Sequence, residues 1–117
     1  MTASTLPFSN LRRAGDTVYL SGELGFDDTG KISGDIVQQT QNVLRRIEAT
    51  LGTSGLSRRD ILSCTCYLVR KDDFSAFNQV YRAFFSHHPL PVRVTVVSEL
   101  VVDALIEIAV IAQDCSV

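Results

Sequence analysis

Two charged residues interrupt the most apolar β-forming segments of the chain. Arg93 is the one charged residue in Val92–Val97, and Glu107 is the one charged residue in Leu105–Ala112. An isolated charge in such a segment costs free energy unless it is paired or used. Three interpretations follow: the two residues form a buried ion pair, one of them lies on an edge strand, or they belong to a functional site.

An arginine and a glutamate together suit one kind of chemistry. The planar guanidinium group grips a carboxylate through two parallel hydrogen bonds. A glutamate in a mostly apolar pocket can hold or activate a water molecule. The functional interpretation is therefore a site that hydrolyses a small carboxylic acid, with Arg93 holding the substrate and Glu107 serving the water.

The other reactive side chains give weaker signals. Cys64 and Cys66 have the spacing of two residues on one face of a strand, which is typical of core positions. The total of three cysteines, with no secretory signal, argues against a disulfide framework. His87 and His88 are adjacent, so their side chains point in different directions, and no carboxylate partner lies beside them. We therefore expect no metal site.

The elements that position these residues follow from the hydrophobic pattern. Ile36–Leu51 carries apolar side chains at helical spacing, with N-cap candidates at Ser33 and Asp35. A second helix should follow Asp72-Asp73, which we expect to cap it. Aromatic residues repeat along that helix at three- and four-residue spacing, typical of core packing: Phe74, Phe77, Tyr81, Phe84 and Phe85. Strands are expected at residues 10–14, 17–22, 61–69, 92–98 and 105–112.

This order, β-β-α-β-α-β-β, predicts an α+β fold. A mixed or antiparallel sheet should carry the two helices on one face. The last strand is apolar on both sides, so we expect the other face of the sheet to be buried against another copy of the chain. Residues 1–117 are expected to form a single domain.

Composition and charge exclude two classes of partner. The net charge is −2 and the basic doublets are short and separate, so we expect no nucleic acid partner. No segment approaches the roughly 20 apolar residues of a membrane span, and the first ten residues lack the pattern of a secretory signal. We therefore expect no membrane partner and a cytoplasmic location.

Four segments, in this order, carry a resemblance to a known family. They are Tyr19-Leu20-Ser21-Gly22, the helix from Asp73-Phe74 to Phe84-Phe85 that contains Asn78, Pro91-Val92-Arg93, and Ile106 to Ala112. Together they resemble the RidA/YjgF family over nearly the whole chain. The resemblance implies a chorismate-mutase-like fold, a homotrimer with sites in the clefts between subunits, and no cofactor. It also implies hydrolysis of reactive enamines and imines, such as 2-iminopropanoate and 2-iminobutanoate, to 2-keto acids and ammonia.

The resemblance also implies roles for individual residues. The family's arginine and glutamate fall on Arg93 and Glu107, which would clamp the substrate carboxylate and orient the attacking water. The family's Ser-Gly pair falls on Ser21 and Gly22, whose backbone would position the substrate nitrogen or the water. Its helix asparagine falls on Asn78, which would brace the cleft.

Two further substrate-binding positions depart from the family pattern. Phe8 stands where many members have a tyrosine, so the ring is kept and the hydroxyl group is lost. Thr95 stands where many members have a cysteine. The proline common before the last strand is also absent. These departures indicate a divergent branch of the family.

Two other functions compete with the deaminase. A non-catalytic binder of small carboxylate metabolites, with a regulatory role, would keep the pocket and lose turnover, and Phe8 is its best support. A ribonuclease or translation inhibitor ranks last, because the chain is acidic and has no pair of histidines arranged for RNA cleavage.

Overall fold

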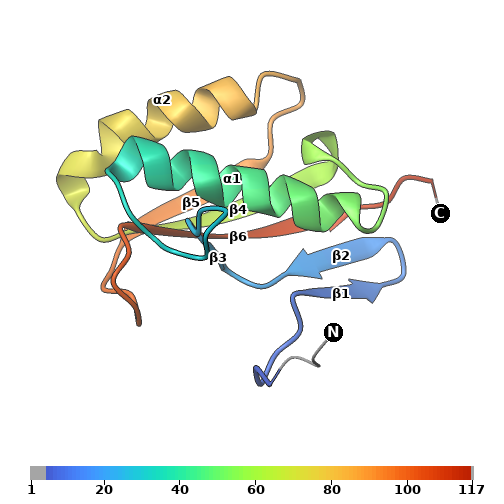
Figure 1. Cartoon of the computed structure of the whole chain (residues 1–117). Coiled ribbons are helices and arrows are strands. Elements are labelled where there is room, and N and C mark those ends of the chain that lie inside the picture. Colours follow the sequence, from blue (N-terminus) through green and yellow to red (C-terminus); the bar gives the residue numbers. More distant parts are fainter. Residues whose placement is uncertain (1–4, 117) are drawn as a thin grey trace.

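The computed structural model describes residues 5–116 and has two helices on one face of a six-stranded sheet (Figure 1). The predicted order of elements is confirmed, with one addition: a two-residue strand, β3, was not predicted because so short a segment has no visible period. Short 3-10 turns cover Arg58–Asp60 and Lys71–Asp73. The elements are β1 (Leu11–Ala14), β2 (Thr17–Leu20), β3 (Glu23–Leu24), α1 (Ile36–Gly52), β4 (Ile61–Leu68), α2 (Phe74–Phe84), β5 (Val92–Val97) and β6 (Ile106–Gln113).

The sheet is mixed, as predicted. Its spatial order is β1-β2-β6-β4-β5, and β3 continues along β6 beyond the end of β2. Strands β4 and β5 pair in parallel, and the other pairings are antiparallel. Strand β5 therefore lies at one edge of the sheet. Of the structural interpretations of the two isolated charges, an edge-strand position is correct for Arg93.

Helix α1 begins as the sequence predicts. The carboxylate of Asp35 accepts a hydrogen bond of 2.9 Å from the backbone N–H of Gln38, which satisfies one of the free donors of the first turn. The predicted apolar face is buried, and it also contains the polar residues Gln39 and Asn42. Gln39 is hydrogen-bonded to backbone groups of Gly34 and Leu105, so its burial leaves these groups satisfied.

Helix α2 begins differently from the prediction. The expected cap at Asp72-Asp73 is wrong, because the side chain of Asp73 makes no capping hydrogen bond. The preceding 3-10 turn runs directly into the helix and holds Asp73 in a helical backbone conformation, whereas a capping residue needs an extended one. The aromatic stripe is largely core: Phe77, Tyr81 and Phe85 are buried, and their rings stack successively at 5.6 and 4.7 Å between centroids.

The core lies between the helices and one face of the sheet. Cys64 and Cys66 are buried in it, as predicted, and burial raises the pKa of their thiols to about 11 and about 12. The opposite face of the sheet has no helix over it (Figure 1). It exposes apolar side chains from its edge strand and from β2: Tyr19, Val92, Val94 and Val96.

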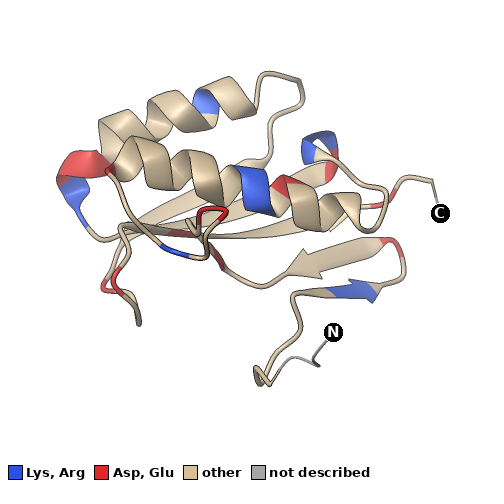
Figure 2. Ribbon diagram, in the orientation of Figure 1, with Lys and Arg blue, Asp and Glu red and all other residues tan. Residues whose placement is uncertain are grey.

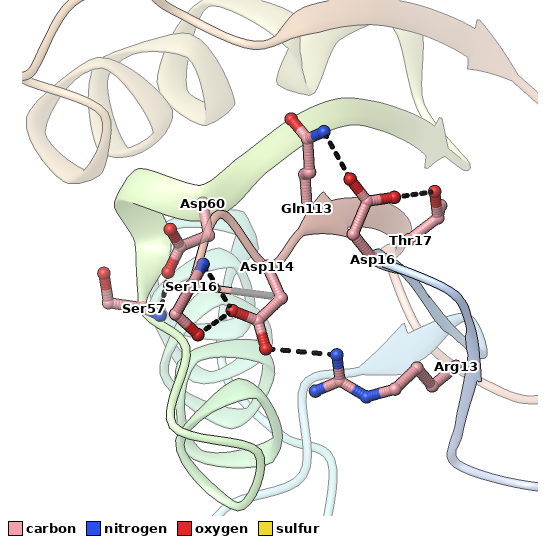
Figure 3. Close-up of polar contacts among 8 residues, drawn as sticks. All are labelled: Arg13, Asp16, Thr17, Ser57, Asp60, Gln113, Asp114 and Ser116. Carbon is pink, nitrogen blue, oxygen red and sulfur yellow. Dashed lines mark hydrogen bonds and ion pairs between the residues drawn. The ribbon is translucent and has the colours of Figure 1, made fainter.

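Polar contacts fasten the β1–β2 hairpin to the end of β6 (Figure 3). Arg13 Nη1 lies 3.1 Å from Asp114 Oδ2, and Gln113 Nε2 donates to Asp16 Oδ2 at 2.9 Å. The backbone N–H and the hydroxyl group of Ser116 both donate to Asp114 Oδ1. These contacts join the first hairpin of the sheet to its last strand. Neither of the helices described in residues 5–116 is long and apolar enough to cross a bilayer.

The Asp114 cluster predicts how stability responds to acid. The hydrogen bonds from Ser116, and then the Arg13 guanidinium, hold the pKa of Asp114 below its ordinary value of 3.8. Such a carboxylate stabilises the fold above the unfolded-state pKa, and this contribution is lost as the pH falls through the folded-state pKa. Asp114→Asn should therefore flatten the fall in unfolding free energy that begins at about pH 5 and continues as the pH drops through the folded-state pKa, which lies below 3.8.

Denaturant titrations at several pH values measure that slope, and Ser116→Ala should give a slope between those of the wild type and Asp114→Asn. Identical slopes for all three proteins would contradict the assigned role of the cluster.

Candidate functional site

The guanidinium group of Arg93 lies over aromatic rings of α2. The register partner of Arg93 on β4 is Cys64, which is buried under the helices, so Arg93 lies on the helix-covered face of the sheet. The guanidinium carbon lies 4.7 Å from the ring centroid of Tyr81 and 5.2 Å from that of Phe77. Burial raises the pKa of the Tyr81 hydroxyl, so the ring is a neutral cation–π partner.

Asn78 fixes the orientation of the guanidinium group. Arg93 Nη1 donates to Asn78 Oδ1 at 2.8 Å. Asn78 and Tyr81 are three residues apart on α2, so they lie on the same helix face and contact the guanidinium from neighbouring turns. The contact is with Arg93 itself, and the cleft-bracing role that the family resemblance implies for Asn78 stays a prediction.

The guanidinium group of Arg93 is left without a carboxylate partner. None of the ion pairs among residues 5–116 involves Arg93. It faces a pocket of about 280 Å³ that contains no acidic residue in its lining. A half-buried cation with open hydrogen-bond donors favours an anionic ligand, and a carboxylate matches its fork geometry. The pocket is lined by Asn78, Tyr81, Arg82, Phe85, Leu90, Pro91 and Arg93.

Glu107 lies on the opposite face of the sheet. Its register partner on β4 is Tyr67, and on the other side it faces Leu24 of β3. Tyr67 alternates with Cys66 and Leu68, which are buried against the helices, so Tyr67 and Glu107 point to the face that no helix covers. Glu107 is half-buried there.

A β-bulge brings Gly22 against the carboxylate of Glu107. Tyr19 pairs with Ile111 and Glu23 pairs with Ile108, so three residues of one strand oppose two of β6. A Cβ built on Gly22 would overlap Oε2 of Glu107. Glu107 can occupy this place because residue 22 has no side chain. This contact is a structural reason for a glycine at position 22.

Ser21 joins the N-terminal segment to this bulge. Its hydroxyl group donates to the carbonyl oxygen of Ser9 at 2.5 Å, and its backbone N–H donates to that of Asn10 at 3.0 Å. The segment that carries Phe8 is thereby held beside the end of β2, and the Phe8 ring is 54% exposed. The hydroxyl group of Ser21 is thus bonded to Ser9, the residue next to Phe8, and its role in the structure is to hold this segment in place.

The predicted site residues therefore form two groups. Thr95 is the register partner of Cys66, so it shares the helix-covered face with Arg93 and Asn78. Gly22 and Glu107 meet on the other face. The interpretation of Arg93 and Glu107 as a buried ion pair within one chain is wrong, because a side chain cannot pass through the sheet to reach the other. Within one copy of the chain, Arg93 and Glu107 therefore do not meet.

Sequence reasoning missed one part of the site. It assigned Phe77 and Tyr81 to the core, whereas the structure shows that their rings also support the Arg93 guanidinium. The position of Asn78 three residues before Tyr81 is the signal that could have pointed to this. Among residues 5–116, no cluster of three or more His, Cys, Asp or Glu side chains could hold a metal ion.

Comparison with known proteins identifies the family. The family model described as endoribonuclease L-PSP, which covers the RidA/YjgF proteins, matches residues 2–114. The chain belongs to the RidA/YjgF family. The solved structure of RidA from the Antarctic bacterium Psychrobacter has a TM-score of 0.87 and 31% sequence identity, and the match covers 95% of this chain and 91% of that one.

RidA/YjgF relatives known by sequence carry two kinds of name. A RutC family protein of Saccharolobus solfataricus is 43% identical over 110 residues, which cover 92% of this chain and 86% of that protein. A 2-iminobutanoate/2-iminopropanoate deaminase of Dermatophagoides farinae is 33% identical over 105 residues, which cover 87% of this chain and 81% of that protein. The family thus includes proteins named as imine deaminases beside proteins with general names.

The contact between Gly22 and Glu107 can be tested by a double-variant cycle. Gly22→Ala should destabilise the protein by less than about 1 kcal/mol, since the added Cβ meets only the far end of the flexible Glu107 side chain, which can move aside. Glu107→Ala in the same chain should remove most of that cost. Additive losses in thermal or denaturant unfolding would show that the two residues do not contact each other.

Proposed function

We propose that the protein hydrolyses reactive 2-imino acids and their enamine tautomers to 2-keto acids and ammonia, at sites formed between subunits of a homotrimer. The observation that carries the proposal is the unpaired Arg93 guanidinium, fixed by Asn78 and open to a pocket. The relative named as a 2-iminobutanoate/2-iminopropanoate deaminase supports the same substrate class.

Arg93 acts as the carboxylate clamp. Two of its N–H groups hold the substrate carboxylate, and the aromatic rings beneath hold the guanidinium plane. The clamp fixes the imine carbon, which is already electrophilic, so no nucleophilic side chain is required. Water adds to the C=N carbon, and one of its protons passes to the nitrogen to give a carbinolamine. The hydroxyl proton of this intermediate then passes to the nitrogen as the C–N bond breaks, which leaves the keto group and ammonia.

Glu107 orients and polarises that water. Since Glu107 and Arg93 lie on opposite faces of their own sheet, the glutamate at a given Arg93 belongs to a neighbouring copy. The uncovered sheet face, which exposes Tyr19, Val92 and Val94, is the surface on which copies would pack.

The assembly can be measured directly. Light scattering at micromolar protein should give three times the chain mass of 12.9 kDa. Association is expected because no other part of the chain covers the apolar face of the sheet. A stable monomer mass at that concentration would contradict the proposed assembly.

Two other functions have weaker support. A non-catalytic carboxylate binder is favoured by Phe8, which is exposed and has no hydroxyl group for a water or a substrate. A ribonuclease, despite the name of the family model, is opposed by charge: basic residues fall in separate short bands on several elements (Figure 2). Such an arrangement lacks the continuous basic stripe that nucleic acid binding usually needs.

The test generates 2-iminopropanoate or 2-iminobutanoate in situ and times the appearance of keto acid with and without the protein. Faster release that scales with protein concentration supports the proposal. Tight binding of unreactive 2-keto acids without any acceleration would favour the non-catalytic binder.

Arg93 variants test the clamp. Arg93→Ala should lose both turnover and the binding of unreactive 2-keto acids, and Arg93→Lys should rescue little because an ammonium group cannot copy the bidentate fork. Both variants should lose less than the 3–5 kcal/mol of stability that breaking a buried ion pair costs. Calorimetry, thermal melts and turnover on the same samples check this, and wild-type keto acid affinity in Arg93→Ala would refute the clamp.

Glu107→Gln separates chemistry from binding. The amide keeps the size of the side chain but loses the negative charge that polarises water, so turnover should fall roughly 10²-fold or more while keto acid affinity changes little. Steady-state kinetics beside calorimetry measures the two effects. A variant with full turnover, or one that loses binding and activity together with its fold, would refute the role of Glu107.

A further inference from the structure

The pocket at Arg93 extends well beyond the guanidinium group. Its volume is about 280 Å³, close to the lower end of the range for small-molecule sites. A three-carbon acid held by Arg93 would leave most of this space to water. The remaining room lies between the C-terminal half of α2 and the segment that leads into β5.

The walls of that remaining space are mostly apolar. Tyr81 of α2 and Phe85, the residue that follows the helix, form one side, and Leu90 and Pro91 form the other. Leu90 is 52% exposed, so its side chain packs little within the chain and is free to contact a ligand. An apolar wall beside an anchored carboxylate favours a ligand whose side chain is itself apolar.

Arg82 is the other charged residue in the lining. It is exposed on α2, and its charge is therefore largely solvated. A distal carboxylate on the ligand would gain little from such a cation, because solvent screens exposed ion pairs. The observations thus favour an apolar side chain over a second acidic group.

We infer that this pocket is the side-chain subsite of the proposed active site, and that the protein prefers branched or aromatic apolar 2-imino and 2-keto acids to the three-carbon ones. The inference rests on the proposed function for its carboxylate anchor. Leu90 is then a specificity-determining residue: filling its position with a larger ring removes the space for the substrate's side chain.

Binding of unreactive acids tests the subsite without requiring turnover. Calorimetry with pyruvate, 4-methyl-2-oxopentanoate and 2-oxoglutarate should give the tightest binding for 4-methyl-2-oxopentanoate, by about tenfold or more over pyruvate. Equal affinities would overturn the inference. Tightest binding of 2-oxoglutarate would also overturn it, since the pocket would then select a distal carboxylate through Arg82.

A matched pair of variants locates the preference. Leu90→Trp should lower the ratio of the two affinities, 4-methyl-2-oxopentanoate to pyruvate, by about tenfold. Val101→Trp adds the same ring at a position that is 98% exposed and outside the pocket lining, and it should leave the ratio unchanged. An unchanged ratio in Leu90→Trp, with a normal melting curve, would overturn the assignment.

Turnover distinguishes the two levels of the proposal. The kcat/KM for the imine made from leucine should exceed that for the imine made from alanine. If the alanine imine is hydrolysed and neither kcat/KM nor affinity responds to side-chain size, the subsite fails and the proposed function stands. If the affinities follow the predicted order and neither imine is hydrolysed, the subsite stands and the deaminase activity fails.

Discussion

Side chains alternate between the two faces of a strand, and paired residues on neighbouring strands share a face. In this sheet the register pairs Arg93 with Cys64 and Glu107 with Tyr67, and these partners lie an odd number of residues apart along β4, so they face opposite sides. The two charges must therefore leave the sheet in opposite directions. Each charge is supported by a different part of the fold, and no side-chain rearrangement within one copy can bring them together.

The two faces are prepared in different ways. On the helix side, α2 supplies rings and an amide to a guanidinium group that has no carboxylate partner among the described residues. On the open side, the bulge carries a glycine, Gly22, whose lack of a side chain leaves room for the carboxylate of Glu107. The same open side exposes apolar residues, so in the proposed trimer the packing of copies and the completion of the site would have a common physical cause.

The sequence predicted most elements because hydrophobic period and capping are local properties. The apolar face of α1 and the cap at Asp35 are confirmed, and so is the mixed sheet with both helices on one face. The faces taken by Arg93 and Glu107 depend on strand register, which is set by pairing between distant segments and has no local signature. The bulge at Gly22, the two-residue β3 and the cap expected at Asp73 were missed or wrong because each depends on what the neighbouring backbone does.

The central claim is that one site takes Arg93 and Glu107 from different copies, and subunit mixing tests it most directly. Arg93→Ala and Glu107→Gln chains, each nearly inactive alone, are co-expressed and purified together. Random assortment into trimers leaves one intact site in every mixed trimer, so turnover should recover to about one quarter of the wild-type value. Turnover of the mixture no higher than the average of the two variants would contradict the claim.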